Sequence, residues 1–277
     1  MKTVKILGCQ MMVEEEKEIN LQKAEVMITR GVEAHQPDIV ILPEMFNTPY
    51  NNSYFPKFSE PYPGESTSRI QALAKKLGVM IIAGSIPEQV EGEKEIYNTT
   101  YVFDHRGELL GKHRKIHLFD IDIPGKITFK ESEVLSRGEE ITVVDTKFGK
   151  IGIAICYDVR FPEIFQIMEK EGAKLMVVPG AFNMTTGPAH WELLMRSRAL
   201  DNQVYLAAVS PARNPDGPYQ AYGHSMIVDP WGRVLEELEE KEGYIYRELD
   251  VEYQEQVRRE LPTRKNRPKD LYETMKK

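Results

Sequence analysis

Short apolar runs of strand length alternate with segments of helical period along the first third of the chain. The runs Asp38–Leu42 and Val79–Gly84 are almost wholly apolar and rich in β-branched residues, a pattern typical of strands covered on both faces. Between them, the pair Ser66-Thr67 offers a cap for a helix that ends at Gly78. This alternation predicts β-α-β units and an α/β fold.

Two hairpins interrupt this pattern in the middle of the chain. The segments Tyr97–Phe103 and Glu108–Arg114 flank one glycine-containing turn, and Ile141–Thr146 and Lys150–Ile155 flank another. Hairpins pair strands antiparallel, whereas β-α-β units pair them parallel. We therefore expect sheets that contain both kinds of pairing.

No Gly/Ser-rich or Pro-rich linker divides the chain, so residues 1–277 are expected to form a single domain. The stretch Val251–Lys277 differs, because it alternates charges densely, carries Pro262 and Pro268, and has too little apolar surface for its own core. Two interpretations of this charged C-terminal extension stay open: a solvated tail, or an arm that packs on a partner subunit.

The charge balance and the cysteines limit the classes of partner and compartment. With 43 acidic against 36 basic side chains the net charge is −7, which disfavours nucleic acid and favours small, diffusible substrates. The N-terminus is charged at Lys2 and Lys5, and no run of about 18 apolar residues occurs, so neither a signal peptide nor a membrane span is expected. Only Cys9 and Cys156 are present, which favours a cytoplasmic location over a disulfide framework.

Cys156 follows the apolar strand Ile151–Ile155, and Pro162 marks a helix start a few residues later. A thiol on such a strand-to-helix turn is expected to be exposed at the carboxyl edge of a sheet, near the positive end of a helix that favours its thiolate. The turn also directs backbone N–H groups toward a reacting carbonyl oxygen. Cys9 lies inside a strand and is assigned to packing.

A nucleophilic thiol needs a base, and the six histidines offer no clear candidate. His113 and His117 have i, i+4 spacing, but no Glu-rich metal signature surrounds them, and no combination with cysteine makes a zinc site. Glu44 is the carboxylate we favour, because it follows an interior strand at the edge where partial desolvation raises a pKa toward that of a general base. Lys115 lies in a basic run and is either a solvated charge or a cation that stabilises an oxyanion.

Three segments around these residues resemble the signature blocks of the nitrilase superfamily of carbon–nitrogen hydrolases. They are Leu42–Asn47, Arg114–Asp120 and Ile155–Glu163, and the order Glu, Lys, Cys along the chain suits that superfamily. The resemblance implies a four-layer α-β-β-α sandwich with mixed sheets, and homodimers or higher homo-oligomers. No cofactor and no metal is expected.

A finer resemblance points to the ω-amidase branch of this superfamily. The similar segments are Asn47–Tyr50, Pro63–Thr67, Asp120–Phe129 and Pro179–Glu192. That branch hydrolyses the terminal amide of α-ketoglutaramate or α-ketosuccinamate, so the resemblance implies an amidase for a small dicarboxylate mono-amide. Two alternatives stay open: the same triad acting on an N-carbamoyl compound, deaminated glutathione or a nitrile, and a non-catalytic scaffold that kept the fold.

The resemblance also implies a role for each residue of the site. Glu44 takes the proton from Cys156, whose sulfur attacks the amide carbon and forms a thioester that water then hydrolyses. Lys115 and the backbone N–H of Tyr157 hold the oxyanion. Glu131 matches a second glutamate that orients the lysine and the substrate; without the resemblance it would be interpreted as an exposed loop charge.

Substrate-binding residues are expected around this group. Tyr50 either donates to a substrate carboxylate or lines the pocket wall. Phe182, Thr185 and Thr186 lie in a segment similar to a pocket loop, with the two threonines as donors. Arg160 is expected to tie the start of the following helix, because the superfamily tends to carry an arginine there whatever the substrate. One face of a later helix is expected to serve packing or a dimer interface. Its residues are Trp191, Leu194, Met195 and Arg198.

Overall fold

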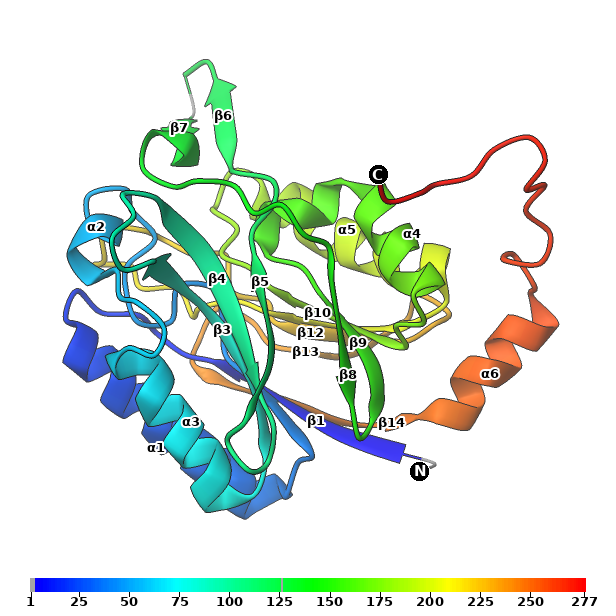
Figure 1. Cartoon of the computed structure of the whole chain (residues 1–277), viewed down its shortest axis with the longest axis horizontal. Coiled ribbons are helices and arrows are strands. Elements are labelled where there is room, and N and C mark those ends of the chain that lie inside the picture. Colours follow the sequence, from blue (N-terminus) through cyan, green and yellow to red (C-terminus); the bar gives the residue numbers. More distant parts are fainter. Residues whose placement is uncertain (1–2, 126) are drawn as a thin grey trace.

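The computed structural model describes residues 3–125 and 127–277, so Met1, Lys2 and Lys126, which belong to segments interpreted above, lie outside the described residues. The described residues form two six-stranded sheets that pack face to face, with helices on the outer face of each (Figure 1). The result is the expected four-layer α-β-β-α sandwich.

The first sheet has the strand order β14-β1-β2-β3-β4-β5. Pairing is parallel between β1, β2 and β3 at its centre, and antiparallel toward both edges. The strands are β1 (Thr3–Gln10), β2 (Ile39–Ile41), β3 (Met80–Gln89), β4 (Ile96–Phe103), β5 (Leu109–Arg114) and β14 (Gly243–Asp250).

The second sheet repeats this arrangement with the order β13-β12-β11-β10-β9-β8. Its central strands β9, β10 and β11 are parallel and its other pairs are antiparallel, so the prediction of mixed sheets is confirmed. The strands are β8 (Thr142–Thr146), β9 (Gly149–Ile153), β10 (Leu175–Pro179), β11 (Tyr205–Val209), β12 (Met226–Val228) and β13 (Val234–Glu237). A separate hairpin projects from the molecule (Figure 1); it consists of β6 (Asp120–Ile123) and β7 (Ile127–Lys130).

Alternation along the strands builds an apolar core on both faces of each sheet. On β1, Ile6 joins the cluster between the two sheets, whereas Leu7 joins the cluster beneath the outer helices. The helices α1 (Lys17–His35) and α3 (Glu65–Leu77) cover this first sheet, and α4 (Pro162–Lys170) and α5 (Gly187–Asn202) cover the second (Figure 1). None of the described helices is long and apolar enough to cross a membrane.

Several short elements were not predicted, because a few residues carry too little periodicity to signal their conformation. They are α2 (Phe55–Phe58), the strands β6, β7 and β13, and two 3-10 turns, η1 (Glu131–Glu133) and η2 (Cys156–Arg160). Longer elements agree with prediction apart from their ends: β3 continues past Gly84 to Gln89, and α5, the helix that carries Trp191, begins at Gly187.

The C-terminal extension starts with a helix that packs on its own chain. In α6 (Val251–Glu260) the side chain of Asp250 caps the first turn, Val257 is buried, and Gln254 Nε2 donates to the carbonyls of Lys174 and Gln203. The interpretation as a solvated tail is therefore wrong for residues 251–260. The dense charges misled it, since two residues of α6 are buried and further side chains of this helix pack against the core between the sheets.

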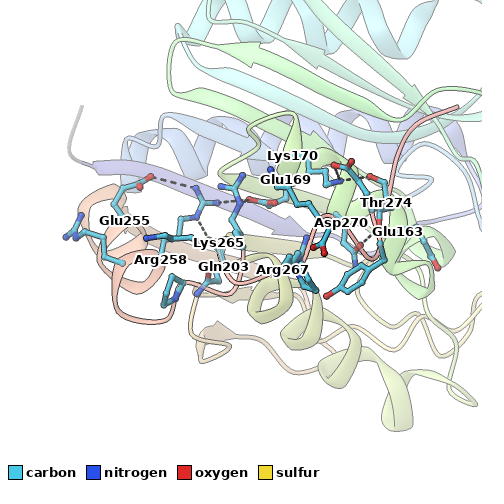
Figure 2. Close-up of a pocket in the computed structure, with 18 residues that line it drawn as sticks. Glu163, Glu169, Lys170, Gln203, Glu255, Arg258, Lys265, Arg267, Asp270 and Thr274 are labelled. Carbon is cyan, nitrogen blue, oxygen red and sulfur yellow. Dashed lines mark hydrogen bonds and ion pairs between the residues drawn. The ribbon is translucent and has the colours of Figure 1, made fainter.

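Beyond α6 the chain turns back toward α4 and stays largely exposed (Figures 1 and 2). Lys170 Nζ donates to Glu273 Oε1 at 2.8 Å and to the carbonyl of Thr274 at 2.6 Å. Between this segment, α4 and α6 lies an open hollow of about 1240 Å³ with a charged lining (Figure 2). Glu169 on α4 pairs there with Arg258 and Arg264. The second interpretation, an arm on a partner subunit, stays a prediction.

Candidate active site

The four residues predicted to act together meet at one edge of the sandwich. Glu44 follows β2 in one sheet and Cys156 follows β9 in the other, and each strand is paired in parallel within its own sheet. Lys115 follows β5 and Glu131 begins η1. Cys156 is 4% exposed and the other three are completely buried. The two sheets thus bring a thiol, two carboxylates and an ammonium into one site closed to solvent.

Lys115 lies at the centre of this group. Its Nζ donates to Glu44 Oε1 at 3.1 Å, to Tyr50 Oη at 3.1 Å, and to Glu131 Oε1 at 3.1 Å, with Glu131 Oε2 at 2.9 Å. Burial alone would lower the pKa of Lys115, but the carboxylates of Glu131 and Glu44 raise it above 10.5, so the side chain stays protonated. The interpretation as a solvated charge is wrong.

Glu131 is held from two sides. Its Oε2 accepts the backbone N–H of Phe119 at 2.6 Å, while Lys115 contacts the same carboxylate. It is completely buried, so the interpretation as an exposed loop charge is wrong as well. The resemblance found this residue; its position between β7 and a short 3-10 turn gave no other signal.

Glu44 contacts donors through both carboxylate oxygens. Its Oε1 accepts from Lys115 and from Asn98 Nδ2 at 2.9 Å, and its Oε2 accepts the backbone N–H of Ala181 at 2.7 Å. The carboxylate and the Cys156 thiol are near enough that each changes the pKa of the other. Burial raises the pKa of Glu44 above 4.5, and Lys115 partly opposes this. The predicted desolvation of Glu44 is confirmed.

Cys156 adopts a left-handed backbone conformation, with φ at 46°, where the chain turns from β9 into η2. The backbone at Gly180 lies close to this turn, since a Cβ on Gly180 would be 3.3 Å from Cys156 Cα. The expectation of an exposed thiolate is wrong. Burial, followed by the nearby Glu44 carboxylate, raises the pKa of Cys156 well above 9.0, so the resting group is a neutral thiol.

The second cysteine belongs to the core. Cys9 is fully buried beneath the outer helices, and burial raises the pKa of its thiol to about 12. Its assignment to packing is confirmed, and both cysteines are free.

Asp158 connects the turn of Cys156 to the strand of Lys115. Its carboxylate accepts the backbone N–H groups of Ile155 and His117 at 3.0 and 2.9 Å. It also contacts His113 Nε2 at 3.1 Å and His117 Nδ1 at 2.8 Å. The two histidines, two residues before and after Lys115, therefore share one partner. No shared partner was predicted for these histidines; the chain leaves the strand after Arg114, and both side chains meet at Asp158.

Sequence reasoning missed two further residues of the site. Asn98 on β4 is completely buried and contacts the carboxylates of both Glu44 and Glu131. An asparagine within a strand is uncommon, and that was the available signal. Tyr219 donates to the carbonyl of Ala181 at 2.5 Å, and its ring lies 5.1 Å from that of Tyr50. It comes from an irregular loop that carries no pattern.

Tyr50 and Phe182 lie where the resemblance placed them, beside the reactive group. Burial raises the pKa of Tyr50 well above 10, so its phenol is neutral and accepts from Lys115. Phe182 is buried edge-on against Trp191, with 5.1 Å between ring centres. A cavity of about 20 Å³, enough for one water molecule, borders Tyr50, Glu44 and Tyr219.

The threonines of the predicted pocket loop serve a turn instead. Asn183 Oδ1 accepts the backbone N–H groups of Thr185 and Thr186 at 3.0 and 2.9 Å, and the Thr186 hydroxyl at 3.1 Å. The expectation of a free donor at Thr186 is therefore wrong, because this turn precedes α5 and uses the hydroxyl. A donor role for the half-buried Thr185 stays a prediction.

Arg160 does not tie the helix start as expected. Its guanidinium lies over the rings of Phe182 and Tyr157, at 5.1 and 5.4 Å, and 3.3 Å from His190 Nδ1. No carboxylate among the described residues lies within 4.0 Å of it, and its buried Nε has no hydrogen-bond partner there. Burial lowers the pKa of Arg160. A half-buried cation without an anion thus borders the turn of Cys156.

In the described parts of the chain, no group of three or more His, Cys, Asp or Glu residues is arranged to hold a metal ion. The four-layer sandwich and the buried Cys-Glu-Lys-Glu group agree with the class of protein expected from the sequence, the carbon–nitrogen hydrolases. The chain belongs to the carbon–nitrogen hydrolase family, whose model matches residues 3–259.

Relatives agree with this assignment over most of their length. Omega-amidase NIT2 of Xenopus tropicalis is 51% identical over 97% of this chain and 96% of its own. Nitrilase homolog 2 of Dictyostelium discoideum is 47% identical over 98% of this chain and 82% of its own. The crystal structure of Saccharomyces cerevisiae Nit3, a member of branch 10 of the nitrilase superfamily, has a TM-score of 0.89 and 42% identity, covering 96% of this chain and 97% of that chain.

Proposed function

We propose that this chain is an ω-amidase that hydrolyses the terminal amide of a small dicarboxylate mono-amide of the α-ketoglutaramate or α-ketosuccinamate type. The reaction type rests on the thiol of Cys156 and the carboxylate of Glu44, which lie together beside the Lys115 ammonium in a site closed to solvent. The omega-amidase relatives support the substrate class.

Acylation begins with a neutral thiol. As Cys156 Sγ attacks the amide carbon, its proton passes to the Glu44 carboxylate. Burial raises the pKa of both groups, so a thiolate beside an ionised Glu44 is disfavoured, and the proton moves as the C–S bond forms. Lys115 Nζ and the backbone N–H of Tyr157 stabilise the negative oxygen that forms. The C–N bond then breaks, Glu44 donates the proton to the nitrogen, and ammonia departs. The acyl group stays bound to Cys156 as a thioester.

Deacylation uses the same carboxylate. Glu44 takes a proton from a water molecule, whose oxygen attacks the thioester carbon, and the cavity beside Glu44 is large enough to hold such a water. The C–S bond breaks, the proton returns to the sulfur, and the dicarboxylate product leaves. Glu131 keeps Lys115 oriented through both steps.

Arg160 supports the choice of an anionic substrate. A guanidinium that is partly buried and lacks a protein anion loses hydration without compensation, and a substrate carboxylate would supply the missing partner. Tyr50 and the aromatic face of Phe182 would line the remainder of the pocket. This assignment replaces the structural role expected for Arg160.

A substrate panel tests the proposal. Ammonia release from α-ketoglutaramate and α-ketosuccinamate should exceed, in kcat/KM, any turnover of N-carbamoyl compounds, deaminated glutathione or nitriles. A preference for one of those compounds would reassign the substrate within the family. The absence of turnover on all of them would support the scaffold alternative.

We further propose a cytoplasmic homodimer or higher homo-oligomer built from single domains of residues 1–277. A free thiol at Cys156 favours a reducing compartment. On α5, Leu193 and Leu200 are 65% and 43% exposed, an apolar face suited to a second copy. The face with Trp191 and Met195, for which packing or a dimer interface was expected, packs in the chain's own core.

A further inference from the structure

Two donors and two acceptors form a closed ring at the centre of the site. Asn98 Nδ2 donates to Glu44 Oε1 at 2.9 Å and to Glu131 Oε1 at 3.3 Å. Lys115 Nζ donates to the same two oxygens at 3.1 Å each. Because both acceptors are carboxylate oxygens, Asn98 can present only its NH2 group to them. It therefore duplicates the contacts of Lys115 without carrying a charge.

The ring leaves one negative charge uncompensated, since two carboxylates face a single ammonium. A second ammonium would cancel that charge, but it would also favour the ionised form of Glu44 so strongly that Glu44 would accept protons poorly. A neutral amide avoids this, because it holds both oxygens and leaves Glu44 basic. The titratable groups that face Glu44 are Lys115, Glu131, Cys156, Tyr50 and Tyr219.

We propose that Asn98 is a positioning residue, which holds the carboxylates of Glu44 and Glu131 side by side and keeps Glu44 ionised and aimed at Cys156. The inference deepens the proposed function and rests on Glu44 as the base. Asn98 touches no reacting atom of the substrate in this scheme; it acts through the two glutamates.

The proposal has a defined consequence for pH dependence. An N–H that donates to a carboxylate favours the charged form, so removal of the Asn98 amide raises the pKa of Glu44. Each activity that needs ionised Glu44 must then be lost at a higher pH than in the wild type. A residue that only fills space on β4 would not produce this shift.

The test compares Asn98→Leu and Asn98→Asp with the wild type and with Thr100→Val. Leucine keeps the volume without a donor, and aspartate keeps the shape but replaces the NH2 group. Thr100 lies two residues along β4, is completely buried, and its hydroxyl has no partner among the described residues, so valine controls for packing. Thermal unfolding reports whether each variant is folded.

Two readouts separate this inference from the proposed function. Alkylation of Cys156 by iodoacetamide needs no substrate and is followed by mass spectrometry of the peptide that contains Cys156. In a plot of alkylation rate against pH, the low-pH limb should move up by about one pH unit in both Asn98 variants. With an amide substrate, kcat should fall about ten- to hundredfold while KM changes less than threefold. A low-pH limb that coincides with that of Thr100→Val in both variants would overturn the proposal. A shifted limb in an enzyme that hydrolyses no amide would support it and count against the proposed substrate alone.

Discussion

Glu44 combines a raised pKa with three fixed hydrogen-bond partners, which is what a base needs when it must accept a proton and return it within one turnover. Replacement by glutamine keeps the shape but removes the acceptor for the Cys156 proton. We expect Glu44→Gln to lower kcat by about 10²- to 10⁴-fold. The measurement is steady-state ammonia release, with folding checked by thermal unfolding.

A matched control is available in Glu88. This second buried glutamate pairs with Arg114 and Lys112 instead of the reactive group. Glu88→Gln should lower stability and leave kcat within a few-fold of the wild type. If both variants lost activity equally, the loss at Glu44 would reflect packing and not proton transfer.

The acid side of the pH profile reports the same carboxyl group. Burial raises the pKa of Glu44, so kcat/KM should fall on acidification with a midpoint above 4.5, where Glu44 becomes protonated. Ionisation of Cys156 adds no second inflection to this profile near neutrality, because its thiol is neutral throughout that range. Initial rates from pH 4 to 9 measure this, and a midpoint at or below 4.5 would contradict it.

At the scale of single residues, the sequence predicted the residues of the reactive group better than the residues that hold them in place. Glu44 and Cys156 could be chosen because each ends an apolar strand, and Lys115 and Glu131 followed from a family resemblance. Asn98 and Asp158 were not predicted, because their contacts join segments that are far apart in the chain. The charge state of Cys156 was mispredicted, since burial between two sheets outweighs proximity to a helix.

Among the elements, η2 and the chain around Lys115 are joined by the buried carboxylate of Asp158. Four nitrogens contact that carboxylate. Although burial opposes it, the hydrogen bonds of His113 and His117 hold the pKa of Asp158 well below 3.8. The charged form is thus stabilised by folding, and this contribution is present above about pH 4 and lost as the pH falls toward the lower folded value.

We therefore expect Asp158→Asn to lower the free energy of unfolding by about 3 kcal/mol at pH 7. Urea unfolding at pH 7 and at pH 3 measures it, because the contribution is lost only below about pH 4. The difference in stability between variant and wild type should shrink at the lower pH, because the wild type then loses part of the same contribution. An equal difference at both pH values would contradict this role.

Prediction of the elements failed where they are short or depend on tertiary contact. The long strands and helices carried clear periodicity, whereas β6 and β7 have only four residues each. Helix α6 looked like a solvated tail because most of its side chains are charged or polar, although Gln254 and Val257 are buried and Tyr253 packs against the core. The ends of elements shifted for the same reason, since pairing partners and not local sequence fix where a strand stops.

At the scale of the whole molecule, the outer face of α5 is the expected dimer contact. Leu193 and Leu200 are seven residues apart and so lie on one face of the helix. Leu193→Glu should convert a species of twice the chain mass into one of a single chain mass, as measured by light scattering after size exclusion. Val26→Glu on α1, also at an exposed apolar position, is the matched control and should leave the mass unchanged.

The predictions on catalysis all depend on the claim that Cys156 carries the reaction as a nucleophile. The most direct test is ammonia release from α-ketoglutaramate by the wild type and by Cys156→Ala, under identical conditions and with equal thermal unfolding. We predict turnover by the wild type and only background release by the variant. A variant that releases ammonia at the wild-type rate would contradict the account.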